Sequence, residues 1–259
     1  MTPPGDGELV HESFRAFVAR RLGADGRAWL DGLPHVVARL ARDWELELGA
    51  ELAGGVLALV VEAGPERVLK VGAPWDRTAD EIEALRRWDG GPAPELLRAD
   101  AARHALLVER IRPGTRAIHA DAGAVAELLG RLHVEPWPAL RPLDEVARRR
   151  VRRALEERRT AAERAERALA TIDALTADAP APVLLHGDLD ERNLLVCDRR
   201  ALAAIDPLPC AGDAAFDAAS WAHANGRPGR RERQRALAAA AGLDPVRVGA
   251  WGEVVAVHG

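Results

Sequence analysis

One short segment of the chain carries side chains that could transfer a phosphoryl group. It runs from Leu184 to Val196 and contains Asp188 and Asn193, five positions apart. Asp206 follows thirteen residues after Asn193, within an Ile-Asp-Pro sequence. An aspartate can orient an acceptor hydroxyl, while an asparagine and a second aspartate can hold Mg²⁺ against nucleotide phosphates. The spacing therefore predicts phosphoryl transfer, with Asp188 as the catalytic base and Asn193 and Asp206 as metal ligands.

Each of these residues also has a simpler interpretation. Asp188 could form an Asx turn or cap a helix, and Asn193 or Asp206 taken alone would most often be a turn residue. Their combination at this spacing favours the metal role, because carboxylate and amide oxygens suit a hard cation. His186 is expected to brace the loop by hydrogen bonds rather than to react.

The basic residues contain a second signal. Of the 36 basic residues, only Lys70 is a lysine. A GC-rich coding bias replaces lysine by arginine wherever either will serve, although a single lysine can also persist by chance. A compact ammonium fits between phosphate oxygens and a carboxylate where a planar guanidinium does not. We therefore expect Lys70, within a short strand-like run, to contact the α- and β-phosphates of a nucleotide.

The helix expected after Lys70 offers two carboxylates that could hold its ammonium. Glu81 shares a helical face with Leu85 and Trp88, at i+4 and i+7, so its side chain should point where the apolar side points. Glu83 should be more exposed. Glu81 is the preferred partner, and Glu83 is the reserve candidate.

Hydrophobic periodicity divides the chain into a strand-rich and a helical region. The first region predicts a helix at 8–22, strands at 44–48, 56–61 and 67–71, a helix from Thr78 to about Trp88 with a capping box to Glu81, and two strands within 94–111. The second predicts helices at 120–133 and 143–175, the segment of Asp188, a hairpin through 198–200, and further helices. Arg112-Pro113-Gly114 breaks the pattern, so the expected domains are 1–111 and 112–259.

Composition excludes several classes of protein. The net charge of −4 provides no basic field for nucleic acid, and glutamates interleave with the arginine run at 148–153, as on a solvated helix face. Apolar runs are too short to span a bilayer, and the N-terminus lacks the regions of a signal peptide. The two cysteines have no C-x-x-C spacing. We expect a soluble, cytoplasmic monomer or weak dimer with no nucleic-acid or membrane partner.

Four segments together resemble the protein-kinase-like fold. Within that fold they are most similar to the aminoglycoside phosphotransferase family, in the branch of streptomycin 6-kinases and hydroxyurea-inactivating kinases. The segments are Leu185 to Asn193, Ala204 to Asp217, Val68 to Val71, and Glu81 to Gly90. The similarity spans roughly residues 44 to 255. It implies an α+β fold of two lobes: a small N-terminal lobe with an antiparallel sheet plus a helix, and a larger, mostly helical C-terminal lobe.

The resemblance also implies an activity. The protein would use ATP, or GTP, with Mg²⁺ to phosphorylate a hydroxyl of a small molecule, and backbone groups of Glu109 and Ile111 would bind the adenine edge. An aminoglycoside antibiotic such as streptomycin is the leading acceptor, which would make the acceptor cationic and the function antibiotic resistance. The alternatives are a kinase of hydroxyurea, an amino alcohol or a sugar, and an inactive kinase-like binding protein. The intact set of Lys70, Asp188, Asn193 and Asp206 counts against the inactive protein.

Some features depart from the family pattern. No G-x-G-x-x-G is present, and only Gly54-Gly55 marks the expected phosphate-binding turn. Asp190 stands where this branch often has histidine. A pocket for a polycation should be acidic, and five carboxylates are available for one: Asp190, Glu191, Asp213, Asp217 and Glu253. Asp213 and Asp217 could equally be caps and backbone clamps.

Overall fold

The computed structural model describes residues 10–52, 57–74, 77–223 and 229–258. The expected Gly54-Gly55 turn lies outside these residues. The chain divides into two compact units, Met1–Arg86 with Pro94–Arg110, and Arg87–Ala93 with Ile111–Gly259. The single cut expected after residue 111 therefore differs from this division chiefly in the segment Arg87–Ala93.

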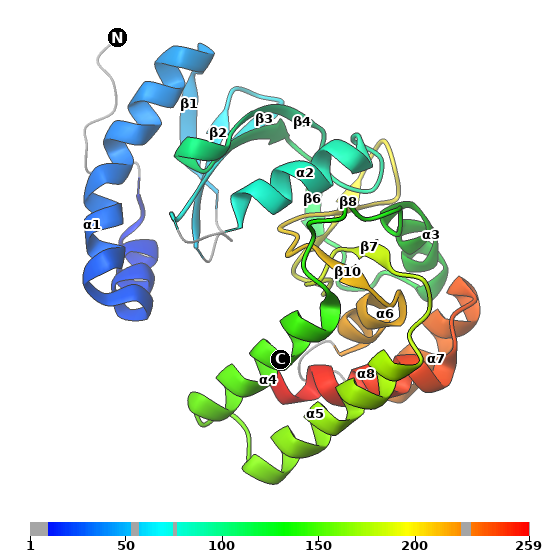
Figure 1. Ribbon diagram of the computed structural model, residues 1–259. Coiled ribbons are helices and arrows are strands. Elements are labelled where there is room, and N and C mark those ends of the chain that lie inside the picture. The colour runs from blue at the N-terminus through cyan, green and yellow to red at the C-terminus, as the bar shows by residue number, and fades with distance from the viewer. Residues whose placement is uncertain (1–9, 53–56, 75–76, 224–228, 259) are drawn as a thin grey trace. The chain divides into compact units, whose positions relative to one another are not determined.

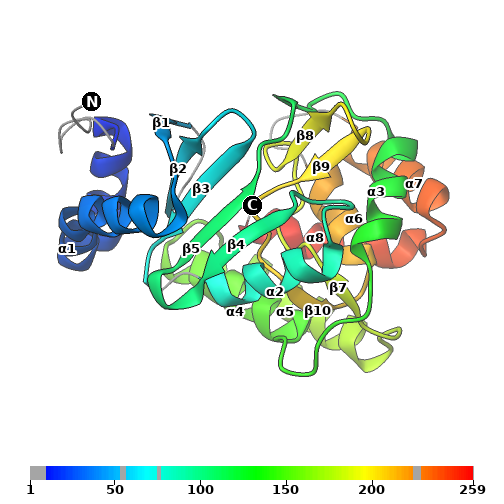
Figure 2. The same ribbon diagram turned by 90° about the horizontal axis from the view of Figure 1, so that it is seen from above.

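The first unit is built on a five-stranded antiparallel sheet with the order β1-β2-β3-β5-β4. Its strands are β1 (Leu48–Glu51), β2 (Ala58–Ala63), β3 (Arg67–Gly72), β4 (Leu96–Asp100) and β5 (Ala105–Glu109), with a short 3₁₀ turn, Ala101–Arg103, between the last two (Figure 2). Lys70 lies on the central strand, opposite Val60 on one side and Leu106 on the other. Because side chains alternate along a strand, buried Leu69 and Val71 point to the face opposite that of Lys70.

Two helices complete this unit, one on each side of the sheet (Figure 1). Helix α1 (Glu12–Trp44) packs its buried residues against the face that carries Leu69 and Val71. The sequence predicted a helix only to residue 22 and a strand from Trp44, and both expectations are wrong. The helical chain bends at Gly23, where φ is 61°, and continues because apolar residues recur at helical spacing as far as Leu40.

Helix α2 (Thr78–Trp88) has the predicted bounds but not the predicted cap. Among the described residues, the buried Thr78 hydroxyl has no hydrogen-bond partner. The amides of Asp80 and Glu81 instead donate to the Arg77 carbonyl, at 3.0 and 3.1 Å. The Glu81 carboxylate accepts from Lys70, so the capping box expected between Thr78 and Glu81 is absent.

The second unit combines helices with two small sheets (Figure 1). Its helices are α3 (Ala122–Leu132), α4 (Leu143–Glu156), α5 (Ala162–Ala177), α6 (Ala215–Ala222), α7 (Arg230–Ala241) and α8 (Pro245–His258). Its strands are β6 (Pro113–Arg116), β8 (Leu194–Cys197) and β9 (Leu202–Ala204), in the order β6-β8-β9, and the pair β7 (Val183–Leu185) and β10 (Cys210–Gly212). Every residue of α6 is buried. Within the described ranges, no helix has the length and apolar character needed to cross a membrane.

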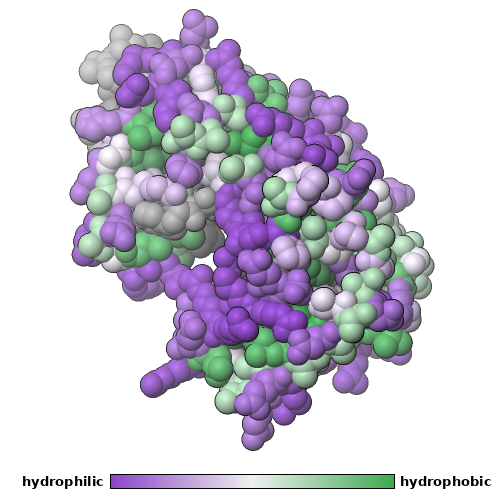
Figure 3. Space-filling view, viewed as in Figure 1, coloured by the Kyte–Doolittle hydropathy of each residue, from purple (hydrophilic) through white to green (hydrophobic). Residues whose placement is uncertain are grey.

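The arginine-rich stretch forms two helices rather than the single helix predicted for 143–175. α4 ends where Arg158 adopts a left-handed conformation, with φ of 55°. The Glu157 carboxylate accepts from Arg153 and Arg159 at 2.8 and 2.9 Å, which stabilises the break. Arg148 pairs with Asp144 and Asp173, as expected for a solvated helix face. On the face shown in Figure 3, hydrophobic side chains form separate groups with hydrophilic side chains between them.

The segment Arg87–Ala93 belongs to the second unit because Trp88 is anchored there. The Trp88 side chain is buried, and its Nε1 donates to the Leu132 carbonyl at 2.9 Å. The indole also stacks on the His186 imidazole, with ring centroids 6.3 Å apart and planes inclined by 15°. Pro92 accepts from the Ala204 amide at 2.8 Å. The sequence showed only that a helix stops here, since contacts with distant residues leave no local pattern.

We expect Trp88→Ala to lower the free energy of unfolding by about 3–5 kcal/mol, because it removes a buried ring and its hydrogen bond. Trp88→Phe should cost less, since it keeps most of the packing. Urea unfolding followed by circular dichroism measures both. Half-buried Trp137 provides the matched control, and an equal loss for Trp137→Ala would contradict the anchoring role of Trp88.

Candidate active site

The predicted catalytic segment begins at the end of strand β7 and is held by its backbone. Gly187 has φ of 77°, and a Cβ at this position would lie 2.1 Å from the Leu208 carbonyl oxygen. The neighbouring His186 carbonyl accepts from the Leu208 amide at 2.9 Å, and the Gly187 carbonyl accepts from Arg150 Nη1 at 2.8 Å. Only glycine fits this conformation and close approach, so the backbone before Asp188 has one available path.

A buried carboxylate from α6 clamps the same backbone. Asp217 is fully buried and accepts from the amides of His186 and Gly187, at 2.8 and 2.9 Å. His133 Nε2 lies 3.2 Å from the carboxylate. Burial alone would raise the pKa of Asp217, but the His133 hydrogen bond, the two histidines and the Gly187 amide lower it on balance. Asp217 is therefore a backbone clamp, which was one of the two roles that the sequence left open.

His186 joins the catalytic segment to the turn that carries Asp206. Its imidazole is fully buried, with Nε2 3.0 Å from the Ile205 carbonyl and Nδ1 3.3 Å from the Asp188 amide. Because a carbonyl only accepts, Nε2 carries the proton and Nδ1 accepts. Burial lowers the pKa of His186, which keeps the ring neutral and this pattern intact at neutral pH. These hydrogen bonds indicate that His186 braces the loop, as expected from the sequence.

Asp188 and Asn193 are in direct contact. Asn193 Nδ2 donates to the Asp188 backbone carbonyl at 2.8 Å and to its carboxylate Oδ2 at 3.2 Å. Since the amide nitrogen faces Asp188, the amide oxygen Oδ1 is the atom that could meet a cation. Asp188 is half-buried, as a residue that must receive an acceptor hydroxyl would be.

The β8–β9 hairpin brings Asn193 and Asp206 to the same end. Asn193 precedes β8, Asp206 follows β9, and the Ile205 amide donates to the Asn193 carbonyl at 2.9 Å. Asp206 has φ of 53°, a left-handed conformation that turns the chain sharply here. No cluster of three or more His, Cys, Asp or Glu suited to a metal occurs among the described residues. Two oxygen-bearing side chains fit Mg²⁺, which usually completes its shell with phosphate and water oxygens.

In the first unit, Lys70 is paired with Glu81. Lys70 Nζ lies 2.8 and 2.9 Å from the two carboxylate oxygens, and the two side chains are 13% and 9% exposed. Glu83 instead lies near Arg86, at 3.9 Å. The helix-face argument thus selected the right carboxylate. The nucleotide contacts of this pair stay a prediction.

The two backbone positions expected to bind adenine differ in their surroundings. The Glu109 amide donates to the Glu95 carbonyl at 2.9 Å, so this N–H is already committed within the chain. Ile111 is buried against Cys197 and Ala203. Any adenine contact of Glu109 would therefore use its carbonyl, and the nucleotide roles of Glu109 and Ile111 stay predictions.

Two further carboxylates that could have lined an acidic acceptor pocket are engaged by other groups. Asp213 accepts from the Ala215 amide at 2.9 Å, from Arg247 Nε at 2.8 Å and from Trp251 Nε1 at 2.9 Å. Glu253 pairs with Arg230 at 2.7 Å. Asp213 is thus a buried structural group, as the capping interpretation allowed.

Asp190 is also engaged, by a residue that the sequence reasoning missed. Its Oδ1 accepts from the Arg192 and Asn193 amides at 2.7 and 3.3 Å, and its Oδ2 accepts from Arg192 Nε at 2.8 Å and from Nη2. A sequence signal for Arg192 did exist, because no other lysine or arginine occurs between Arg167 and Arg199.

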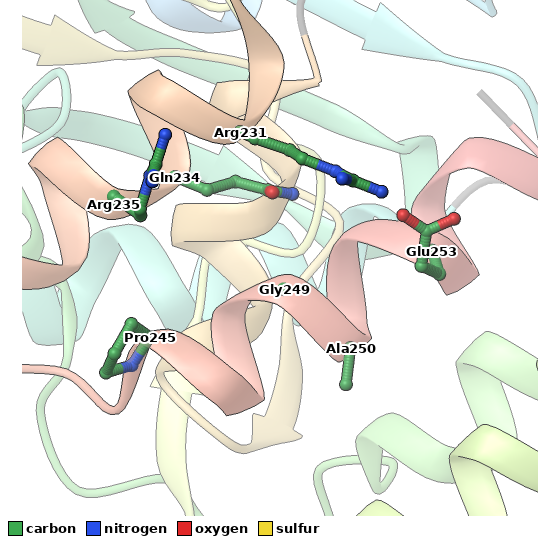
Figure 4. A pocket seen from close by; sticks show the side chains of 7 residues that line it. All are labelled: Arg231, Gln234, Arg235, Pro245, Gly249, Ala250 and Glu253. Carbon is green, nitrogen blue, oxygen red and sulfur yellow. The ribbon is translucent and has the colours of Figure 1, made fainter.

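A hollow of about 490 Å³ lies between α7 and α8 (Figure 4). It is lined by Arg231, Gln234, Arg235, Pro245, Gly249, Ala250 and Glu253. Its one carboxylate, Glu253, already pairs with Arg230. This hollow contains no residue of the catalytic segment, and its basic lining is the opposite of what a polycation requires.

The neutral state of His186 predicts a pH dependence of stability. Burial lowers the folded-state pKa of His186 below its ordinary value of about 6.5, so the unfolded chain binds its proton first as the pH falls. The stability that His186 contributes should be fully present above pH ~6.5 and be lost as the pH falls toward the folded-state pKa. Urea unfolding of the wild type and His186→Gln from pH 8 to 5 measures this. The difference between the two proteins should shrink on acidification, and a constant difference would contradict the assignment.

Known proteins that resemble this chain are kinases or phosphotransferases. Residues 44–258 match the family described as aminoglycoside/hydroxyurea antibiotic resistance kinase. A streptomycin 6-kinase of Streptomyces griseus is 34% identical over 214 residues, covering 77% of this chain and 69% of the relative. A hydroxyurea phosphotransferase of Kitasatospora aureofaciens is 37% identical over 247 residues, covering 88% and 72%.

Solved structures share the fold at low identity. A choline/ethanolamine kinase family protein from Mesorhizobium loti superposes with a TM-score of 0.66 at 18% identity, covering 87% of this chain and 82% of that one. A ternary complex of an aminoglycoside phosphotransferase with streptomycin and ATP gives a TM-score of 0.60 at 16% identity, covering 84% and 85%. The fold is therefore the two-lobe, protein-kinase-like α+β fold. With most of its length matched, and with relatives above 30% identity, the chain belongs to the aminoglycoside/hydroxyurea antibiotic resistance kinase family.

Proposed function

We propose that this protein transfers the γ-phosphate of ATP to a hydroxyl of a small molecule. The observation that carries the proposal is the contact of Asn193 with Asp188, braced by His186 and joined through the β8–β9 hairpin to Asp206. These are the side chains that phosphoryl transfer requires, held by backbone contacts that leave little freedom. Use of ATP fits a cytoplasmic enzyme, which could act as a monomer or weak dimer.

Each residue has a defined role in this proposal. Asp188 orients the acceptor hydroxyl and takes its proton late, because the transition state is loose and depends more on positioning than on deprotonation. Lys70, fixed by Glu81, contacts the α- and β-phosphates of the nucleotide. Asn193 and Asp206 hold Mg²⁺, which when bound offsets the negative charge of the phosphate oxygens. His186 keeps the Asp188 backbone and the Asp206 turn in register.

An aminoglycoside such as streptomycin is the leading acceptor, which would give a role in antibiotic resistance. Two relatives, from Streptomyces griseus and Streptomyces glaucescens, are streptomycin 6-kinases. A second candidate is hydroxyurea, since a hydroxyurea phosphotransferase is 37% identical to this chain. One structural observation favours this second candidate: Asp190, Asp213, Asp217 and Glu253, four of the five carboxylates that could bind a polycation, are paired within the chain.

Asp188→Asn should lower kcat for phosphoryl transfer by about 10²- to 10⁴-fold, because it removes the general base while keeping the side-chain shape. A coupled assay of ADP release, with streptomycin and hydroxyurea as separate acceptors, measures the loss. Asp198→Asn, on the exposed β8–β9 turn, is the matched control and should keep wild-type activity. Transfer by Asp188→Asn at the wild-type rate would show that the mechanism is wrong.

Asp206→Asn should raise the Mg²⁺ concentration needed for half-maximal transfer by about tenfold or more, because a neutral amide replaces a carboxylate ligand. Titration of Mg²⁺ at fixed ATP measures this shift, and excess chelator should abolish transfer by the wild type. An unchanged Mg²⁺ requirement would remove Asp206 from the metal site.

A further inference from the structure

The catalytic segment carries a preorganised ion pair in addition to its base and metal ligands. Asp190 accepts from the backbone amide of Arg192 with one carboxylate oxygen and from its guanidinium with the other. Arg192 is therefore held at two points, and its side chain loses much of the freedom that an exposed arginine normally has. A guanidinium fixed in this way is preorganised to donate hydrogen bonds to a molecule that binds beside the loop.

The pair presents its positive member to solvent. The Asp190 side chain is 20% exposed, whereas that of Arg192 is 63% exposed. A guanidinium has five N–H donors, and Asp190 occupies one on Nε and one on Nη2. The hydrogen bonds that Arg192 donates to Asp190, together with the charges of Asp190, Asp188 and Glu191, raise the pKa of Arg192 above its ordinary value. Its positive charge is therefore constant at any physiological pH.

The location of the pair gives it a role toward the acceptor. Arg192 immediately precedes Asn193, whose amide contacts the Asp188 carboxylate at 3.2 Å. An acceptor hydroxyl that reaches Asp188 must approach this segment, so its substituents come within the field of the exposed guanidinium. A positive group on the acceptor would be repelled, while a carbonyl or hydroxyl oxygen could accept a hydrogen bond from Arg192.

Asp188 and Glu191 also lie within the field of Arg192, so its guanidinium offsets part of the negative charge of this segment. Asp190 itself is neutralised by Arg192, and buried Asp217 is saturated by backbone amides and His133. Asp213 is likewise committed to Arg247 and Trp251. Arg192 therefore strongly influences which charge an acceptor can carry when it binds beside this segment.

We propose that Arg192, oriented by Asp190, is a specificity-determining residue that selects against positive charge beside the reacting hydroxyl and favours neutral acceptors with a hydrogen-bond-accepting oxygen. The proposal rests on the kinase function given above and favours its second candidate acceptor, neutral hydroxyurea, over the polycation streptomycin. Asp190 acts as a positioning residue in this proposal. Arg192 contacts the acceptor and takes no part in the transfer of the proton or the phosphoryl group.

The test compares a polycationic and a neutral acceptor, streptomycin and hydroxyurea. KM and kcat are measured for both with the wild type, Arg192→Ala, Arg192→Lys and Asp190→Asn. Arg167→Ala, which removes an exposed arginine on α5 with a 71% exposed side chain, is the matched control for net charge. Arg192→Ala should lower KM for streptomycin about two- to fivefold, the range of an exposed charge interaction, and leave KM for hydroxyurea within twofold or raise it slightly.

The other two variants should differ from Arg192→Ala. Arg192→Lys keeps the charge and should retain the wild-type preference between the two acceptors. Asp190→Asn removes the compensating carboxylate and should raise KM for streptomycin. Equal changes for the two acceptors, or an equal effect of Arg167→Ala, would overturn the proposal. A loss of kcat with both acceptors at unchanged KM would also overturn it, because it would indicate a role toward the phosphoryl group.

A binding measurement separates this proposal from the kinase function. Isothermal titration of streptomycin without nucleotide, at low and high salt, reports repulsion by Arg192 without any turnover. If no variant phosphorylates either acceptor, both candidate acceptors of the proposed function fail, while tighter low-salt binding of streptomycin to Arg192→Ala would still support the role of Arg192. Equal streptomycin affinity of the wild type and Arg192→Ala at low salt would overturn that role.

Discussion

The site depends on one buried carboxylate. Asp217 lies in the fully buried helix α6, where an unpaired charge would cost several kcal/mol, on the order of 3–5 when one partner of a buried pair is removed. The amides of His186 and Gly187 satisfy it, together with the His133 imidazole. The charge can therefore stay buried only while the backbone before Asp188 keeps its observed path. The stability of the helical unit and the geometry of the segment around Asp188 therefore depend on the same hydrogen bonds.

The neutral imidazole of His186 connects this clamp to the neighbouring segments. His186 receives its position from Asp217 and transmits it to the Asp188 amide and the Ile205 carbonyl. The ring packs near Trp88, and its complete burial lowers the pKa of His186 and so favours the neutral form. Asp188 follows β7 and Asp206 follows β9, so the hydrogen bonds of one shared imidazole to the Asp188 amide and the Ile205 carbonyl keep the two segments in register.

The sequence predicted the parts of the site that depend on local spacing. Asp188 and Asn193 lie within one loop, and the helical phase of Glu81 is set by its neighbours, so both could be read from residue order. The role of Asp217 stayed open, because the amides that it clamps are 31 and 30 positions earlier in the chain. The extension of α1 and the break at Arg158 were missed for a different reason: tertiary packing and a single left-handed residue decide them. Arg192 escaped notice because its importance arises from the geometry of Asp190, not from a motif.

The position of Arg192 also bears on how such an enzyme could change in evolution. The backbone of the segment is fixed from outside, by Asp217, Arg150 and the Leu208 amide and carbonyl, and the exposed arginine side chain contributes to none of these contacts. A lineage could exchange this one residue without disturbing the machinery that handles the phosphate. With the proposed roles, a change in the charge of the accepted antibiotic would require few mutations, because Asp188 and Arg192 are neighbouring but separable positions.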